Sequence, residues 1–217
     1  MTSFLIGLSR ALPGREKDYA DWYAGQHLAD VRAVPGVVGG ILYGRLNAQS
    51  PHPWALCGMY ELDRSVDEVL AEIGRRAGGA EMPMTDAIDR DATLFLTATA
   101  LAPRVEVAKP SGATLLTLVL ANPAEGQDAA YNAWYSDRHI PDVLAVPGFV
   151  AARRFRLAAQ TAGKPSPWRY MATYELEAER LPEIRAEMAA RSGGPLMPDS
   201  PSVQRAGMYT ELFQRLS

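Results

Sequence analysis

The chain has 217 residues, of which 47% are hydrophobic and 22% charged, a composition typical of a folded globular protein rather than a disordered one. Its 22 basic and 25 acidic residues give a formal net charge of −3, which provides no broad positive field, so we expect no nucleic-acid partner. The single cysteine, Cys57, excludes an internal disulfide, and no apolar run reaches the roughly 20 residues of a membrane-spanning helix, so we expect a cytoplasmic protein without a membrane partner.

Apolar runs separated by Pro-Gly and Gly-Gly signals predict six elements in each half of the chain. The first half is predicted to form a strand at 3–8, a helix at about 16–34, a strand from 37, a strand at 54–62, a helix at 66–76 and a strand at 92–100. The second half is predicted to form the same series at 114–120, about 127–146, from 149, 168–176, 181–191 and 206–213. The order β-α-β-β-α-β is that of the ferredoxin-like unit.

The two halves are copies of one unit. Residues 19–40 and 131–152 align without a gap at an offset of 112 and are identical at 11 of 22 positions. The offset grows to 114 and then to 115 further along the chain, which indicates small insertions in loops. We therefore predict an N-terminal half at 1–104 and a C-terminal half at 113–217.

The predicted topology leaves one face of each sheet uncovered. Both helices of a ferredoxin-like unit lie on one side of its four-stranded sheet, so the other side must be covered. We expect the two sheets of this chain to face each other and to enclose a cavity. The predicted fold class is α+β, with tandem ferredoxin-like βαββαβ units that form one α/β barrel within the chain. Exposed edge strands would allow two such chains to pair as a homodimer.

The repeated segment carries the motif Tyr-x-x-Trp-Tyr-x-x-x-His-(Leu/Ile)-x-Asp-Val-x-Ala-Val-Pro-Gly. This motif resembles the EthD-like branch of the dimeric α/β-barrel superfamily, in which an aromatic helix carries a histidine and ends in Pro-Gly before the second strand. The resemblance covers nearly the whole chain and implies a fused, intrachain version of a barrel that most members build from two chains. It implies activities ranging from cofactor-free monooxygenases, isomerases, cyclases, hydrolases and lyases to haem enzymes, besides members without known activity. It also implies substrates from aromatic-compound catabolism.

Helical spacing places two tyrosines, a histidine and an aspartate on one stripe in each half. The second-half stripe is Tyr131, Tyr135, His139 and Asp142, and the first-half stripe is Tyr19, Tyr23, His27 and Asp30. A histidine can move protons near neutral pH, an aspartate can orient it, and a tyrosine hydroxyl can donate to an oxyanion. The other interpretation is that the aromatic residues form the core and that His-x-x-Asp braces the helix end.

The second predicted strand differs between the halves. Arg154 and Arg156 stand where the first half has Leu42 and Gly44. Alternation along a strand puts both arginines on one face, where they could hold a carboxylate or enolate. The other interpretation is a solvated edge strand protected by charge. Because the halves have diverged, we expect one working pocket, and the sequence favours the one beside His139.

These patterns predict a cofactor-independent enzyme that uses histidine acid/base catalysis on a small oxygenated or carboxylated organic molecule, in an isomerisation, a lyase reaction or ester or lactone hydrolysis. Two alternatives stay open, a cofactor-free monooxygenase acting on a phenolic substrate and a non-catalytic binding or structural barrel. The predicted catalytic residues are His139, Asp142, Tyr135 and His27. The predicted substrate-binding residues are Arg154, Arg156, Tyr131, Trp134, Tyr174 and Trp168.

No cofactor or metal is expected. His-x-x-Asp supplies at most two metal ligands per half, and no further His or Cys pair lies near it in the sequence. His139 could serve as an axial haem ligand, but the sequence has no haem-attachment signal. It also has neither a glycine-rich phosphate loop nor a G-x-S-x-G motif, which disfavours nucleotide cofactors and the usual serine-hydrolase mechanism.

Overall fold

The computed structural model describes residues 2–161 and 163–217, and these residues divide into two compact units. Unit 1 comprises Met1–Ala100, Leu157–Ser166 and Phe213–Ser217, and unit 2 comprises Leu101–Arg156 and Pro167–Leu212. Two short segments of the second copy therefore belong to unit 1, which differs from the predicted halves. Within the described ranges, the helices are too short or too polar to cross a lipid bilayer.

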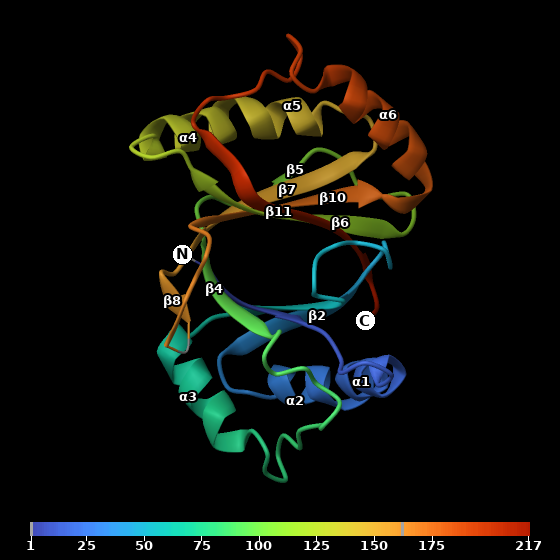
Figure 1. The fold of residues 1–217 in the computed structure, drawn as a ribbon, viewed down its shortest axis with the longest axis vertical. Coiled ribbons are helices and arrows are strands. Elements are labelled where there is room, and N and C mark those ends of the chain that lie inside the picture. The colour runs from blue at the N-terminus through green and yellow to red at the C-terminus, as the bar shows by residue number, and fades with distance from the viewer. Residues whose placement is uncertain (1, 162) are drawn as a thin grey trace. The chain divides into compact units, whose positions relative to one another are not determined.

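Unit 1 has the predicted βαββαβ order. Its elements are β1 (Ser3–Ser9), α1 (Glu16–Trp22), η1 (Tyr23–His27), α2 (Leu28–Arg32), β2 (Val37–Arg45), β3 (Leu56–Leu62), α3 (Val66–Arg76) and β4 (Leu94–Ala100). The strands form an antiparallel sheet in the order β2-β3-β1-β4, and α1, α2 and α3 lie on one side of it (Figure 1). The end of β11 pairs with the outer edge of β2, and the short hairpin of β8 (Gln160–Thr161) and β9 (Lys164–Pro165) completes the unit.

Unit 2 repeats this arrangement. Its elements are β5 (Val105–Glu106), β6 (Thr114–Pro123), α4 (Asp128–Trp134), η2 (Tyr135–His139), α5 (Ile140–Leu144), β7 (Phe149–Leu157), β10 (Tyr170–Glu177), η3 (Ala178–Arg180), α6 (Leu181–Arg191) and β11 (Val203–Arg215). The strand order is β11-β6-β10-β7-β5, with α4, α5 and α6 on one side (Figure 1). Both units thus have the predicted ferredoxin-like order, and the short strands β5, β8 and β9 were not predicted.

Each aromatic helix contains one turn of π-helix, where the sequence predicted a continuous α-helix. The π turns, η1 and η2, occupy equivalent positions and end at the repeated histidine. A π turn joins residues five apart, so it brings Trp22 over His27, with ring centroids 4.4 Å apart. Trp134 and His139 stack in the same way at 4.6 Å. In an α-helix, residues five apart would point about 140° away from each other.

The repeated Pro-Gly ends each aromatic helix for a steric reason. Gly36 and Gly148 have φ values of 99° and 103°, in the left-handed region that favours glycine. A Cβ atom at these positions would lie 2.9 Å from the Val69 side chain and 2.8 Å from the Ile184 side chain, respectively. The conformation and the close helix packing both require glycine, which explains why the motif stands in both copies.

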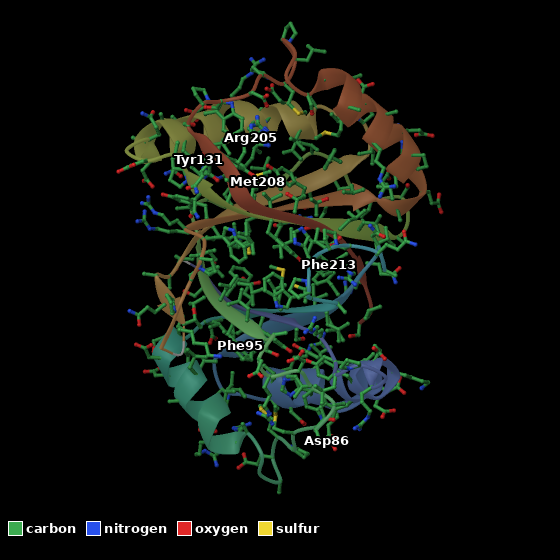
Figure 2. The ribbon with its side chains drawn as sticks, in the orientation of Figure 1. Asp86, Phe95, Tyr131, Arg205, Met208 and Phe213 are labelled. Carbon is green, nitrogen blue, oxygen red and sulfur yellow. The ribbon has the colours of Figure 1, made fainter. Side chains whose placement is uncertain are left out.

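The core of each unit lies between the helices and the sheet. In unit 1 it includes Tyr19, Tyr23 and Tyr60, and in unit 2 the equivalent Tyr131, Tyr135 and Tyr174. Figure 2 shows Tyr131 below α4, on the side that faces the sheet. The aromatic stripes therefore point toward the sheet of their own unit, and this helix-facing side is where a histidine could meet a ligand.

Candidate functional site

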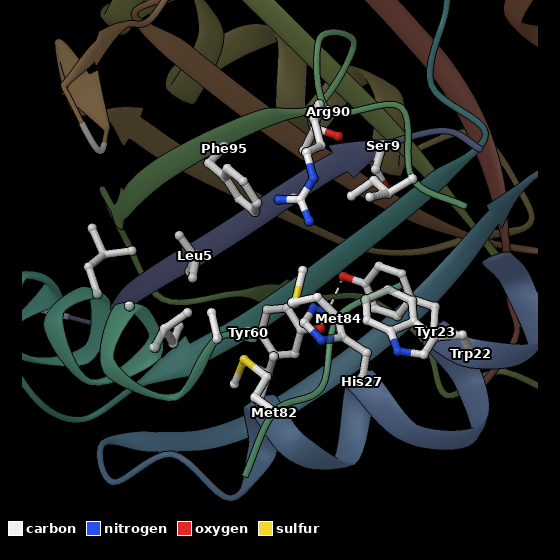
Figure 3. Close-up of a pocket in the computed structure, with 18 of the residues that line it drawn as sticks. Leu5, Ser9, Trp22, Tyr23, His27, Tyr60, Met82, Met84, Arg90 and Phe95 are labelled. Carbon is white, nitrogen blue, oxygen red and sulfur yellow. Dashed lines mark hydrogen bonds between the residues drawn. The ribbon is translucent and has the colours of Figure 1, made fainter. Parts of the chain in front are cut away.

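A pocket of about 440 Å³ lies in unit 1, between the helices and the sheet (Figure 3). All of its lining residues belong to unit 1, and they come from β1, the aromatic helix, β3, α3, the segment between α3 and β4, β4 itself, and the β8–β9 hairpin. The sequence favoured a pocket beside His139 and a cavity between facing sheets. Both expectations stay predictions, and the pocket described here lies beside His27, on the helix-covered face of its sheet.

The walls of the pocket are mainly apolar and partly flat. The stacked rings of Trp22 and His27 form one side, and the side chains of Met82 and Met84 lie beside them (Figure 3). Thioethers adapt to irregular apolar shapes and contact aromatic rings favourably. Leu5 and Gly7 of β1 form part of the wall along the sheet. A small molecule with a flat hydrocarbon body suits this lining.

Two tyrosine hydroxyls meet at the sheet side of the pocket. Tyr23 and Tyr60 share a hydrogen bond of 3.1 Å, and the equivalent pair in unit 2, Tyr174 and Tyr135, shares one of 3.3 Å. Burial raises the pKa of Tyr23 well above its usual range and raises that of Tyr60 in the same direction. Both phenols are therefore protonated at neutral pH and act as hydrogen-bond donors.

Both repeated histidines are neutral at pH 7. Burial lowers the pKa of His27 to about 4, and it also lowers that of His139 to about 4, although the nearby Asp142 charge opposes the shift. The Nδ1 atoms of both rings are buried without a hydrogen-bond partner in the described part of the chain. The imidazoles are thus available as proton acceptors, with a much lower pKa than the near-neutral value assumed from the sequence.

Asp142 lies near His139 and its charge acts to raise the pKa of the imidazole, but His139 Nδ1 has no hydrogen-bond partner in the described part of the chain, and the orienting role expected of Asp142 stays a prediction. The carboxylate pairs with Arg138, with 2.8 Å between Nε and Oδ2. Arg138 stands four residues earlier on the same helix, at the spacing that favours an ion pair, and its full charge outcompetes a neutral imidazole. Stacking on Trp134 and an edge contact with Tyr135 orient the His139 ring.

Arg154 and Arg156 lie in unit 2 and do not line the pocket of unit 1. Arg154 is 4% exposed, and its guanidinium donates to Ser136 Oγ at 2.8 Å and to Asn132 Oδ1 at 2.9 Å. It also lies 4.4 Å from the centroid of the Tyr135 ring, a cation–π contact. Arg156 is exposed and donates to the Tyr170 hydroxyl at 3.4 Å. Their predicted role in holding an anion stays a prediction.

The remaining predicted binding residues also belong to unit 2. Tyr131 and Tyr174 are buried in the core. Trp134 donates from Nε1 to the Pro198 carbonyl at 3.3 Å, and Trp168 donates from Nε1 to the Gly207 carbonyl at 2.7 Å. The structure thus brings Tyr131, Trp134, Tyr135, His139 and Tyr174 together in one cluster. Trp168 lies elsewhere, against the Tyr209 ring.

Several pocket residues were missed by the sequence reasoning. Arg90 and Lys164 line the pocket from a loop and from the β8–β9 hairpin, and Met82 and Met84 line it from the segment after α3. The recurrence of Met-Pro in both copies was the only sequence signal near them. Among residues 2–161 and 163–217, no group of three or more His, Cys, Asp and Glu side chains could hold a metal ion.

Gly58 permits the contact between the tyrosines and the sheet. A Cβ atom at Gly58 would lie 2.2 Å from the Tyr23 hydroxyl oxygen, so Gly58→Ala should displace the phenol and lower the free energy of unfolding by about 1–3 kcal/mol. Urea denaturation measures this change. Gly39→Ala is the matched control, because its Cβ would meet only Glu61 Cβ at 3.8 Å. Equal effects of the two substitutions would show that the close contact has no energetic role.

Comparison with known proteins identifies solved structures with a similar fold. No family model and no curated protein matches the chain. Among solved structures, an anthrone oxidase-like protein is 12% identical with a TM-score of 0.61, covering 100% of this chain and 91% of its own. A putative monooxygenase from Fusobacterium nucleatum subsp. nucleatum is 6% identical with a TM-score of 0.58 and coverages of 100% and 93%. A mutant chlorite dismutase from Candidatus Nitrospira defluvii is 11% identical with a TM-score of 0.58 and coverages of 100% and 91%.

These likenesses extend over the whole chain, and at such low identity they establish the fold alone. The chain has the fold of the dimeric α/β-barrel proteins, and the predicted α+β class with tandem ferredoxin-like units is confirmed. Membership of the EthD-like branch stays a prediction.

Proposed function

We propose that this protein is an enzyme that transfers a proton on a small, oxygenated, mainly apolar molecule in the pocket of unit 1, without a cofactor. The observation that carries the proposal is that a neutral imidazole and two protonated phenols line one apolar pocket. General bases and oxyanion donors are most effective where water is displaced. The full-length likeness to proteins described as a monooxygenase and a chlorite dismutase supports an enzyme over a structural barrel.

The proposed step begins when His27 removes a proton from a carbon atom beside a carbonyl group. The electron pair moves onto the carbonyl oxygen, and the Tyr23–Tyr60 pair donates a hydrogen bond to this oxyanion. The low pKa of His27 makes it a weak base alone, but the enolate that forms nearby stabilises the imidazolium. Return of the proton to a different carbon atom completes an isomerisation, and expulsion of a leaving group completes a lyase reaction.

The test is deuterium uptake at carbon. The protein is incubated in D₂O with a panel of aryl ketones, β-keto acids and lactones, and proton NMR follows the C–H signals while an electrode records dissolved oxygen. Enzyme-dependent exchange without oxygen consumption supports the proposal. Oxygen consumption without exchange would instead favour the cofactor-free monooxygenase. If no compound exchanges, reacts or consumes oxygen, a binding protein is the better interpretation.

Removal of one hydroxyl from the Tyr23–Tyr60 pair is expected to have a moderate effect on the reaction rate. Tyr60→Phe should lower kcat by about 10-fold, less than the loss of a sole oxyanion donor, because the Tyr23 hydroxyl stays in the pocket. The exchange rate in D₂O with the best substrate of the panel measures this change. Tyr174→Phe removes the equivalent hydroxyl in unit 2 and serves as the matched control. A larger decrease of kcat in Tyr174→Phe than in Tyr60→Phe would assign the reacting site to unit 2.

A further inference from the structure

The pocket of unit 1 carries an unbalanced positive charge. Its lining includes two cationic side chains, Arg90 and Lys164, and among the described residues that line it there is neither an aspartate nor a glutamate. Figure 3 shows the Arg90 guanidinium directed into the pocket, between Phe95 and Ser9. In the described part of the chain, no hydrogen bond or ion pair involves the side chain of Arg90 or Lys164. Both charges are therefore available to a ligand.

The arginine of unit 2 that is equivalent to Arg90 has different surroundings. The segments 82–90 and 197–205 correspond at an offset of 115, because both begin with Met-Pro and both prolines accept a hydrogen bond from the tryptophan of the aromatic helix. In unit 2 the equivalent arginine, Arg205, pairs with Asp199 at 2.5 Å. In unit 1 the position of Asp199 is occupied by Met84, which lines the pocket. Both copies thus carry the cation, but unit 1 has an apolar side chain where unit 2 has the counter-ion of this cation.

Lys164 reaches the same pocket from the second copy of the repeat. The segment that carries it is attached to β4 at Thr97, whose N–H donates to Thr161 Oγ1 at 2.9 Å, whose hydroxyl accepts from Thr161 Oγ1 at 3.1 Å and whose carbonyl accepts from the Ala158 N–H at 2.8 Å. The rise of the repeat offset from 112 to 114 falls between residues 157 and 167, so the two extra residues lie in the segment that carries Lys164. The two copies of the repeat therefore differ in length in the segment of the second copy that carries Lys164.

We propose that Arg90 and Lys164 form an anion-recognition site, and that the substrate of this pocket is an apolar molecule with a carboxylate group. The proposal rests on the proposed function for the choice of pocket and adds the substrate class. A carboxylate accepts two parallel hydrogen bonds from a guanidinium, and the apolar lining strengthens the attraction by lowering the local dielectric constant. The carboxylate end would lie at Arg90 and Lys164, and the apolar body would lie along the Trp22–His27 stack.

The test uses two probes of equal shape and different charge, 2-naphthoate and 2-naphthamide, with isothermal titration calorimetry on the full chain. The native protein should bind the naphthoate at least about 10-fold more tightly than the amide. In the double variant Arg90→Gln/Lys164→Gln, the Kd of the naphthoate should rise at least about 10-fold, and that of the amide should change less than about twofold. Arg205→Gln is the matched control and should leave both Kd values unchanged.

A second variant locates the binding. Gly7→Val places a branched side chain in the pocket wall, where unit 2 has Val119, and a Cβ atom at Gly7 meets no heavy atom closer than 3.5 Å. The variant should fold, as judged by circular dichroism, and should bind neither the naphthoate nor the amide. The proposal is overturned if neither probe binds the native protein, if the amide binds as tightly as the naphthoate, or if Gly7→Val retains naphthoate binding. None of these readouts requires turnover, so a failure of the proposed reaction is recognised separately.

Discussion

Replacement of His27 by alanine is expected to lower kcat/KM by at least about 100-fold, the usual contribution of a general acid or base. The imidazole lines the pocket of unit 1 together with the tyrosine pair, and no second titratable group of similar basicity is among the lining residues. The measurement is the rate of deuterium exchange with the best carbonyl substrate. His139→Ala is the matched control, because the two rings have the same stacking partner and the same position in a π turn.

The comparison of the two histidines decides between the pocket found in unit 1 and the sequence-based preference for His139. A large decrease of kcat/KM in His27→Ala together with a small decrease in His139→Ala supports a reacting site in unit 1. The reverse order would assign the reaction to the cluster around His139 in unit 2. The pH profile gives an independent check, because a base with a pKa of about 4 keeps kcat/KM level from pH 8 down to about pH 5. A decline centred near pH 6.5 would contradict the proposed role of His27.

Acidification from pH 7 to pH 5 is expected to lower the free energy of unfolding by about 2 kcal/mol per repeated histidine, or about 4 kcal/mol in total. Burial lowers the pKa of His27 and of His139 from about 6.5 to about 4. Between these values the unfolded chain binds more protons than the folded chain, so stability is full above about pH 6.5 and falls as the pH falls toward 4. Urea denaturation at pH 7, 6 and 5 measures the effect.

The matched variants are His27→Gln, His139→Gln and the double variant. Each single variant should remove about half of the pH dependence, and the double variant should remove nearly all of it. Ion-paired carboxylates such as Glu72, whose pKa is lowered to about 2 by hydrogen bonds from Arg75 and Arg76, lose their charge only at lower pH and do not contribute in this window. An unchanged slope in the double variant would show that other groups cause the acid sensitivity.

The fold was predictable because two copies of one pattern constrain each other. The Pro-Gly pairs, the aromatic helices and the apolar strands recur at nearly constant offsets, so an error in one copy would conflict with the other. The π turns were not predictable from a 3.6-residue period, because residues at positions 23 and 27 fall on one face in either type of helix. The ion pair between Arg138 and Asp142 could have been predicted, since opposite charges four residues apart on a helix commonly pair.

The position of the pocket could not be derived from the sequence, because it depends on which side chains lie opposite one another after folding. Gly7 has Val119 as its counterpart, and Met84 has Asp199. Gly7 leaves room at the wall of the unit 1 pocket and Met84 contributes no charge to it, but these effects exist only once the helices cover the sheet. Before the register of the strands is known, they cannot be distinguished from neutral divergence between two copies.

The pairing of residues 213–217 with β2 has a consequence for the independence of the first repeat. Gln214 stands opposite Gly44 in the β2 ladder, and the Leu216 N–H donates to the Leu42 carbonyl at 2.8 Å. A gene fragment that stops at residue 104 would therefore encode a β2 whose outer backbone groups lack these partners, and it would also lack Lys164. The first repeat therefore relies on residues encoded in the second copy, and a fragment of this kind is not a self-sufficient version of unit 1.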